Sequence, residues 1–429
     1  MDGVAARPVV GLFGAFDTGE LGEVALRRVL EAELARRRPD IALAALAPFG
    51  AERPIPGDEG RPAHPLLPPS RTYPYVLDAL IITGDVLADA RSWAARYPAG
   101  APIADRDIAT LALTGVRGGL EPAPSVIWFA VAAPGGDTDL SELAGRDVWA
   151  RDEITQERLG GTAVQSGDPV LLAGRVFPAD LLRRRADLLR LCGAVPAGRG
   201  LVVEVTSGFS GSPANERLED ALTAALRADP KLSVVVLTMN PTDQPLSGAS
   251  FNVQGHAAER VHQLPIWAGL DDVAATMSRS AAVIATSPAG AHLAASLGAS
   301  VSVADATQRH RVDASIPVIE GDMTDAIQGM LAGAHPVAID KAVETLDAAL
   351  TELAERLPRD GSAPPDAIEP DQVGSALAIL QQRLVDERTA LQAELSRLQA
   401  ELDHLRASPE HRIARPLREG YQRWQRRRT

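Results

Sequence analysis

Short apolar segments alternate with helix-forming segments along most of this chain, and the alternating pattern occurs twice. Strands that alternate with helices pair in parallel and carry helices on both faces of the sheet. The two runs therefore predict an α/β fold of two doubly wound, Rossmann-like domains with a cleft between them. In the first run, strands are predicted at 8–15, 41–47, 76–83, 126–132 and 147–150, and helices at 22–38, 152–159 and 175–192. In the second run, strands are predicted at 201–206, 232–238, 281–285 and 300–304, and helices at 215–227 and 271–278.

The domain boundary is expected in the turn-rich stretch that separates the two runs. Residues 1–197 would form the N-terminal domain and residues 198–357 the C-terminal domain, in the GT-B-like arrangement found in many transferases. The last predicted helix, at 337–357, is placed to brace the two domains. Three further segments follow, a proline-rich linker, a helical segment and a tail, at 358–371, 372–407 and 408–429.

The helical segment carries a leucine at every seventh position. The leucines are Leu377, Leu384, Leu391, Leu398 and Leu405. A heptad repeat of this length, after a flexible linker, predicts a C-terminal coiled-coil helix through which the chain forms a homo-oligomer. The alternative is a single amphipathic helix folded back on the body of the protein.

Charge is distributed unevenly between the body of the chain and its end. The net charge of −13 disfavours general binding of nucleic acid by the body. The segment 406–429 is basic, with eight Arg against two Glu, and it also carries Tyr421 and Trp424. Such a mixture predicts peripheral contact with an anionic membrane surface, and a solvated basic end is the alternative.

The single cysteine, Cys192, cannot form a disulfide within the chain and fits a reducing compartment. No secretory signal is evident at the start, and no apolar stretch approaches the roughly 20 residues that span a bilayer. The expectation is a cytoplasmic protein whose membrane contact, if any, is peripheral and at the inner face.

The segment Thr286-Ser-Pro-Ala-Gly-Ala-His-Leu-Ala-Ala-Ser-Leu-Gly298 is the strongest indication of a binding site. It follows an apolar strand and consists of a turn of small residues and an Ala/Leu-rich helix. The first N–H groups of such a helix are unpaired, and together with the helix dipole they attract anions. In doubly wound sheets, ligands bind at turns of this kind.

With its flanks, this segment resembles the C-terminal signature of the polysaccharide pyruvyl transferase family. In the family an apolar strand precedes Ser-Arg-Leu-His-Gly and a small apolar helix. Here Pro288 and Gly290 stand at the Arg and His positions, and His292 lies two residues later. Further blocks resemble the family at Gly11–Leu26, Leu80–Asp85 and 148–153, so the likeness extends over about residues 8–356.

The resemblance implies that the N-terminal domain faces a sugar acceptor. The candidate acceptor-binding residues are Gly19, Glu20, Gly22, Gly84 and Arg151. Glu23 and Asp85 are candidate catalytic carboxylates that take protons from sugar hydroxyls. Helix capping and turn formation are the alternatives for these acidic residues.

The C-terminal domain is the expected donor side. Arg309, His310 and Arg311 are expected to supply the charge that Pro288 and Gly290 lack, although a solvated basic loop is the alternative. His292 and His310 complete the candidate catalytic set. The candidate donor-binding residues are Ser207, Gly208, Ser210, Ser287, Gly290, Arg309 and Arg311.

The function implied by the resemblance is transfer of a pyruvyl group from phosphoenolpyruvate to a sugar of a cell-surface polysaccharide. The acceptor would be a glycan or a lipid-linked sugar. No cofactor is implied, and the eight His show no spacing typical of metal ligands. Two alternatives remain open: a GT-B-type glycosyltransferase that uses a nucleotide-sugar, and a non-catalytic relative that scaffolds polysaccharide assembly through its coiled coil.

Overall fold

The protein divides into two compact units, Met1–Ala363 and Pro364–Thr429. A computed structural model describes parts of the first unit alone, so the predicted coiled coil at 372–407, the tail at 408–429 and the end of the linker lie outside the described residues. The described residues are 7–47, 64–65, 77–87, 125–133, 140, 143, 148–160, 163–196, 198–206, 208–209, 211–240, 255–265, 268–333 and 335–361.

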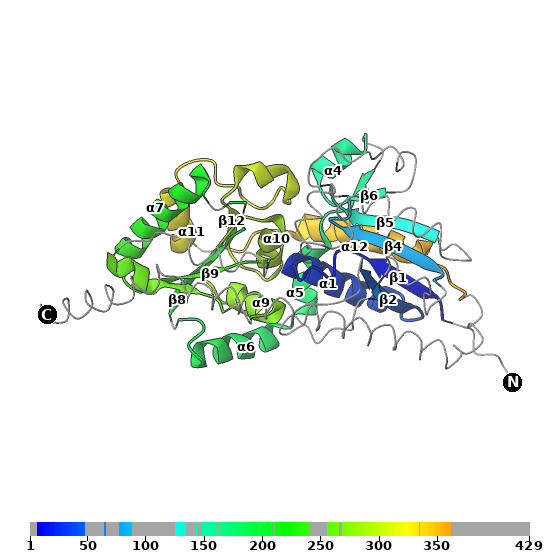
Figure 1. Ribbon diagram of the computed structural model, residues 1–429, viewed down its shortest axis with the longest axis horizontal. Helices are drawn as coiled ribbons and strands as arrows, with labels where there is room; N and C mark the ends of the chain where they lie inside the picture. Colours follow the sequence, from blue (N-terminus) through cyan, green and yellow to red (C-terminus); the bar gives the residue numbers. More distant parts are fainter. Residues whose placement is uncertain are drawn as a thin grey trace, which may run out of the picture. The chain divides into compact units, whose positions relative to one another are not determined.

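The first sheet has seven parallel strands in the order β3-β2-β1-β4-β5-β6-β7 (Figure 1). The order reverses between β1 and β4, and in doubly wound sheets the ligand crevice lies at the carboxyl ends of the strands at such a point. The strands are β1 (Val9–Phe13), β2 (Ala42–Ala47), β3 (His64–Pro65), β4 (Ala79–Gly84), β5 (Ser125–Val131), β6 (Val148–Ala150) and β7 (Val164–Gln165).

The second sheet has five parallel strands in the order β10-β9-β8-β11-β12, and here the order reverses between β8 and β11. The two sheets confirm the predicted fold class of two doubly wound α/β halves. The strands are β8 (Arg199–Glu204), β9 (Leu232–Leu237), β10 (Val261–Gln263), β11 (Ala282–Ala285) and β12 (Val301–Val303).

Among the described residues, the predicted helices are present with ends that shift by a few residues, except that the helix predicted at 175–192 is interrupted at Phe177 and Pro178 and forms two helices. The structure adds several short elements that the sequence pattern did not indicate, among them β3, β7, β10, α11 and the 3-10 helices. The α-helices are α1 (Leu21–Arg37), α4 (Glu153–Arg158), α5 (Ala173–Val176), α6 (Ala179–Leu191), α7 (Pro213–Ala228), α9 (Leu270–Ser278), α10 (Pro288–Ser296), α11 (Met323–Ala332) and α12 (Asp340–Arg356), and the 3-10 helices are η2 (Pro169–Leu172), η4 (Gly255–Arg260) and η5 (Ala306–Arg311).

One apolar core is continuous from the first sheet to the second. Val10 and Leu12 of β1 belong to the same buried cluster as Val202 of β8 and Val235 of β9. The intervening members come from α1, α9 and α10, which lie between the inner faces of the sheets. Because alternate residues of a strand point to opposite faces, the outer faces feed two separate clusters. The two halves therefore bury apolar surface jointly.

Helix α12 packs beside the first half, although the sequence assigns it to the end of the second (Figure 1). Leu346, Leu350 and Leu353 are fully buried, and α12 contacts α1 and η2. The Arg356 guanidinium lies 4.4 Å from the centre of the Trp149 ring. The second sheet begins at Arg199, close to the domain boundary expected at 197/198. The N-terminal half nevertheless includes α12, which lies at the end of the described residues.

Asp347 of α12 is held by two arginines. It accepts hydrogen bonds from Arg175 at 2.7 and 2.6 Å and from Arg37 at 2.6 Å. The hydrogen bonds from Arg175, opposed by partial burial, lower the pKa of Asp347 to about 2. A carboxyl whose pKa is lowered by folding stabilises the protein above its ordinary pKa and loses that contribution as the pH falls.

We therefore expect wild-type stability to decrease between about pH 4 and pH 2, and Asp347→Asn to decrease less steeply over that interval. Thermal unfolding measured from pH 2 to pH 6 tests this expectation. Asp220→Asn, at an exposed position on α7, is the matched control and should follow the wild-type curve. If the stability of wild type and of Asp347→Asn decreased in parallel over this pH range, the expectation would be wrong.

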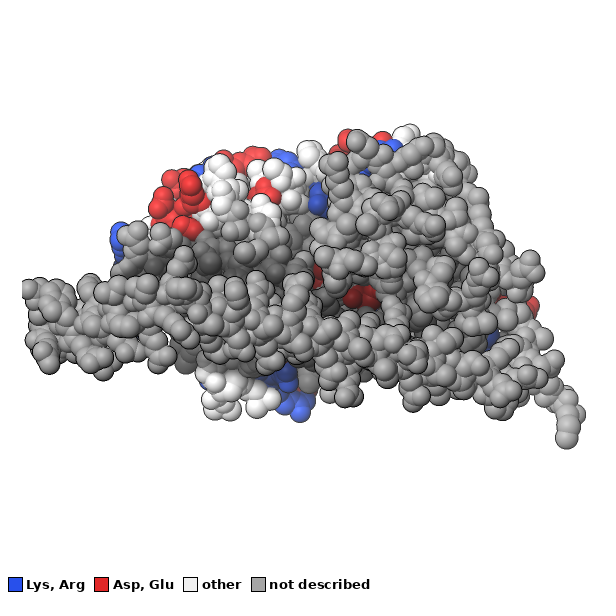
Figure 2. Space-filling view, viewed as in Figure 1, with Lys and Arg blue, Asp and Glu red and all other residues white. Residues whose placement is uncertain are grey.

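Acidic and basic side chains are intermixed over the described part of the face drawn in Figure 2. No described helix combines the length and the apolar composition needed to cross a bilayer.

Candidate functional site

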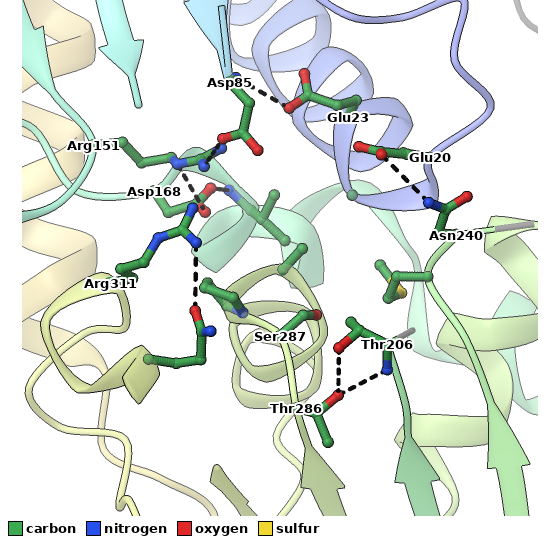
Figure 3. Close-up of a pocket in the computed structure, with 16 residues that line it drawn as sticks. Glu20, Glu23, Asp85, Arg151, Asp168, Thr206, Asn240, Thr286, Ser287 and Arg311 are labelled. Carbon is green, nitrogen blue, oxygen red and sulfur yellow. Dashed lines mark hydrogen bonds and ion pairs between the residues drawn. The ribbon is translucent and has the colours of Figure 1, made fainter. Parts of the chain in front are cut away.

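A cavity of about 330 Å³ lies at the carboxyl ends of strands from both sheets (Figure 3). Both reversal points of strand order open onto it, which is where doubly wound folds bind ligands. Its lining comes from both halves of the described unit: Glu20, Gly22, Glu23, Asp85, Arg151, Asp168, Val170, Thr206, Met239, Asn240, Thr286, Ser287, Pro288, Ala289, Gln308 and Arg311.

The first turn of α1 joins the two halves at one side of this cavity. The Leu21 N–H donates to the carbonyl of Met239, which follows β9, at 2.6 Å. Gly22 has no room for a side chain, because a Cβ there would lie 2.7 Å from the Cβ of Ala289 at the start of α10. The glycine predicted to contact an acceptor therefore also allows α1 and α10 to approach closely.

Glu23 and Asp85, the two carboxylates of the first half that the sequence analysis names as catalytic candidates, lie next to each other. Glu23 is buried on α1, and its Oε1 accepts the Asp85 N–H at 3.2 Å. Gly84, at the end of β4, has φ +79°, and a Cβ there would collide with the Glu23 carboxylate. Gly84 thus does not line the cavity, but it leaves the space that Glu23 occupies.

Arg151 is largely enclosed by carboxylates, with its side chain 11% exposed. It forms an ion pair with Asp85, and its Nε lies 3.8 Å from Asp168. Burial alone would lower the pKa of Arg151, but Asp85, Asp168, Glu23 and Asp152 together raise it. The positive charge of Arg151 is therefore balanced by the protein itself.

His292 is buried below the cavity and does not line it, contrary to the catalytic role predicted for it. Its Nε2 accepts the Asp313 N–H at 3.1 Å, so the proton resides on Nδ1, which donates to Asp168 at 2.9 Å. Asp168 also accepts the Val170 N–H and caps η2. Both ring nitrogens are in use, and His292 connects the two halves rather than meeting a substrate.

The turn between β11 and α10 does not offer the anion site expected from its sequence. Glu204, at the end of β8, is fully buried and accepts the N–H groups of Thr286 at 2.8 Å and Ser287 at 3.0 Å, together with the Ser287 hydroxyl at 2.9 Å. The Gly290 N–H donates to the Ser287 hydroxyl oxygen. An internal carboxylate thus occupies the donors that a ligand phosphate would use.

One N–H of this first turn remains for a ligand. Pro288 has no N–H, and no described group accepts the N–H of Ala289, which lines the cavity. Gly290 does not line the cavity. Its role is steric, because a Cβ there would lie 2.8 Å from the Glu204 carboxylate.

Arg311 and Gln308 reach the cavity, whereas Arg309 and His310 do not. A 3-10 helix has three residues per turn, so in η5 residues 308 and 311 share a face and 309 and 310 point elsewhere. Arg309 pairs with Glu320 at 2.5 Å, and His310 contacts Glu153 at 2.8 Å on the exposed side. The donor-binding role predicted for Arg309 and the catalytic role predicted for His310 are therefore not supported by their positions.

The Arg311 guanidinium is the cation of the C-terminal wall. Its Nε is buried and has no hydrogen-bond partner among the described residues, lying 3.9 Å from Asp152. Its other contact is with the Gln308 side-chain oxygen at 3.4 Å. In contrast to Arg151, this guanidinium retains hydrogen-bonding capacity for a ligand.

Of the residues predicted from the sequence, seven line the cavity: Glu20, Gly22, Glu23, Asp85, Arg151, Ser287 and Arg311. Seven others among the described residues do not: Gly19, Gly84, Gly208, Gly290, His292, Arg309 and His310. Ser207 and Ser210 lie outside the described residues.

Several residues that line the cavity were not predicted from the sequence, although they share one feature: they follow parallel strands of the second sheet. Thr206 lies two residues after the end of β8 and Asn240 three residues after the end of β9, at the carboxyl edge of the second sheet. The Thr206 N–H donates to the Thr286 hydroxyl at 3.0 Å. The Asn240 side chain lies 3.5 Å from Glu20, across the cavity mouth. Polar residues that follow adjacent parallel strands are the signal that would have identified them.

The two walls of the cavity differ in chemistry, as Figure 3 shows. Glu20, Glu23 and Asp85 extend from the first half, and Ser287 and Arg311 from the second. Within the described residues, no group of three or more His, Cys, Asp or Glu side chains is arranged to hold a metal ion. The arrangement can accept protons on one wall and bind an anion on the other.

No family model matches the sequence, and no curated protein matches it. Solved structures do match in fold. A candidate UDP-N-acetylglucosamine 2-epimerase from Listeria monocytogenes superposes with a TM-score of 0.52 at 12% identity, covering 83% of this chain and 100% of its own. The UDP-GlcNAc 2-epimerase of Methanocaldococcus jannaschii gives 0.49 at 11% identity, covering 81% of this chain and 100% of its own. The ADP-heptose heptosyltransferase II of E. coli gives 0.40 at 14%, covering 81% and 99%. The protein has a GT-B-like fold of two α/β halves with parallel sheets.

Proposed function

We propose that this protein is a GT-B-type enzyme that transfers a sugar from a nucleotide-sugar to a hydroxyl acceptor. The observation that carries the proposal is the cavity with two unlike walls, carboxylates from the first half and an arginine with hydroxyls from the second. The fold likeness to a candidate UDP-N-acetylglucosamine 2-epimerase supports a nucleotide-sugar as the donor.

The donor diphosphate would bind the second wall. Among the described groups of that wall, the Arg311 guanidinium and the Ala289 N–H are donors that remain for an anion, and Thr206 and Ser287 also line the second half of the cavity. Arginine suits this role because its planar fork forms two parallel hydrogen bonds to phosphate oxygens. Positive charge at this position would also stabilise the departing diphosphate.

The acceptor would bind the first wall, and Glu23 would be the general base. The acceptor hydroxyl loses its proton to Glu23, its oxygen bonds to the anomeric carbon, and the bond from that carbon to the phosphate oxygen breaks. Asp85 is the weaker candidate for this role, because its ion pair with Arg151 stabilises the unprotonated carboxylate.

The pyruvyl transfer implied by the sequence resemblance requires the same second wall, because phosphoenolpyruvate is also a phosphate-bearing anion. The arginine at the family's position is replaced by Pro288, and the adjacent turn is occupied by Glu204. We therefore rank pyruvyl transfer below glycosyl transfer. The third possibility is a non-catalytic scaffold without a donor site, and the experiment must distinguish it from the two transferase activities.

A thermal-shift assay with UDP, ADP and phosphoenolpyruvate tests the proposal, using Arg311→Ala and, as matched control, Arg309→Ala. We expect a nucleoside diphosphate to protect the wild type and the control, because a ligand at 100 times its Kd stabilises by about 2.7 kcal/mol. Arg311→Ala should weaken the affinity for the nucleoside diphosphate about 10-fold to 100-fold and so remove half or more of that protection, since a charged hydrogen bond contributes about 1.5–3 kcal/mol.

Two other outcomes contradict glycosyl transfer, and a third contradicts the assigned donor site. Protection by phosphoenolpyruvate alone would favour pyruvyl transfer, and protection by none of the three would favour a scaffold. Equal losses in Arg311→Ala and Arg309→Ala would place the donor outside this cavity.

A further inference from the structure

We propose that His292 is a positioning residue that fixes the place of Arg311 in the cavity. This inference rests on the function proposed above, because it gives His292 a part in binding the donor diphosphate through Arg311. His292 does not touch the ligand in this role. It acts through the backbone N–H of Asp313, two residues after Arg311 in the chain.

The helix η5, which carries Arg311, has few strong attachments of its own. None of its residues is buried. Its side chains contact Glu320 and Glu153 through Arg309 and His310, and all four of these side chains are about half exposed or more. Exposed pairs of this kind contribute little to stability. The position of η5 therefore depends on the segments at its two ends.

The two ends of η5 are held in different ways. At the start, Asp305 caps the helix by accepting the N–H of Thr307 at 3.0 Å. At the end, Val312 packs in part against the apolar core, and the Asp313 N–H donates to Nε2 of His292 at 3.1 Å. Apolar packing is not directional, whereas a hydrogen bond is. The bond to His292 therefore sets the direction of the chain at this end of η5.

His292 is itself held in one orientation. It lies on α10, and its side chain is 3% exposed. Its Nδ1 donates to Asp168 at 2.9 Å, and Asp168 in turn caps η2 in the first half. Because a buried polar group without a partner is costly, the ring cannot turn without losing both of its hydrogen bonds. It is a rigid anchor for the end of η5.

The same ring relates Arg311 to the first half of the cavity. Asp168 lines the cavity and lies 3.8 Å from the Nε of Arg151, and Figure 3 shows Arg311 pointing toward Asp168. His292 thus links a carboxylate of the first half to the segment that carries Arg311. An arginine that is already held in place loses less conformational entropy when it binds phosphate. The affinity for the donor should therefore depend on His292.

Two substitutions separate this role from a purely structural one, because each preserves a different hydrogen bond of the ring. In His292→Asn the amide nitrogen takes the place of Nδ1 and still donates to Asp168, but the Asp313 N–H loses its acceptor. In His292→Gln the amide reaches the place of Nε2 and still accepts from Asp313, but Asp168 loses a donor. A hydrogen bond to a charged group contributes more than one between neutral groups, so His292→Gln should be the less stable variant.

We expect the affinity for UDP, measured by isothermal titration calorimetry, to follow the opposite order. His292→Asn should weaken it about 5-fold to 10-fold and His292→Gln by less than about 3-fold, since residues that act through a common contact are coupled. In the Arg311→Ala background, His292→Asn should change the affinity by less than about 2-fold, because the group that it positions is gone. His310→Asn removes an exposed contact of the same helix and is the matched control, which should bind UDP like the wild type.

The order of the Arg311 side chain can be measured without any ligand. Its Nε–H signal, identified by its loss in Arg311→Ala, should show the NMR relaxation of an ordered group in wild type and in His292→Gln, and that of a mobile group in His292→Asn. If the wild type does not bind UDP, the proposed donor is wrong, and this measurement still decides whether His292 positions Arg311.

Three results would overturn the inference. One is an Arg311 side chain that is equally ordered in wild type and in both His292 variants. Another is a set of UDP affinities that follows the stabilities of the variants. The third is a loss of affinity in His310→Asn as large as that in His292→Asn.

Discussion

Arg151→Met is expected to lower the free energy of unfolding by about 3–5 kcal/mol, which is the usual cost of breaking a buried ion pair from one side. The substitution leaves Asp85, Asp168 and Glu23 close together without the guanidinium that separates them. Methionine fills a similar volume, so the loss reports mainly on charge. Urea denaturation at pH 7 measures the effect.

Two further measurements make this prediction specific. The difference between Arg151→Met and wild type should shrink below about pH 4, because protonation removes the buried negative charges. Arg184→Met on α6, where the arginine pairs with Asp180 at the surface, should change stability by less than about 1 kcal/mol. Similar losses in both variants would show that the Arg151 cluster is not a buried electrostatic centre.

Glu204→Met is expected to destabilise the protein by a comparable amount, about 3–5 kcal/mol. The variant removes the acceptor for the N–H groups of Thr286 and Ser287, and a buried N–H without a partner is costly. Glu204→Gln should cost less, about 1–3 kcal/mol, because the amide oxygen can take the place of Oε2, which accepts both N–H groups.

Amide hydrogen exchange locates this second effect. The N–H groups of Thr286 and Ser287 should exchange much faster in Glu204→Met, while those of β9 change only as global stability changes. Glu216→Met on the exposed face of α7 is the control and should leave both unchanged. Unchanged protection of the turn would show that Glu204 does not hold it.

The fold could be predicted because its signal is repeated along the chain. Continuous apolar segments such as Leu80–Ile82 mark strands that are buried on both faces, and two runs of them define two parallel sheets. β3 and β7 have two residues each and no periodicity of their own, so they depend on the neighbouring strand to form. Sequence reasoning could not have found them.

The candidate site could be predicted only where a residue's place in the chain fixes its place in space. Asp85 follows β4 directly and Ser287 lies two residues after β11, and both line the cavity. His292 and Glu204 were misjudged or missed because their roles depend on partners far away in sequence, Asp168 and the β11–α10 turn. Of the basic residues at 309–311, Arg311 alone lines the cavity, because this segment forms a 3-10 helix. The amino-acid composition of the segment does not indicate that helix type.

Helix α12 has a consequence for how the chain is made. Helix α12 covers apolar surface of α1 and η2, and it follows these elements in the sequence by about 170 residues or more. Their surface is therefore synthesised well before α12 is available to cover it. A ribosome therefore exposes an unfinished first half for most of translation, and that half closes only when residues near 356 have left the exit tunnel. The nascent protein would need the second sheet, or a chaperone, to shield this surface in the interval.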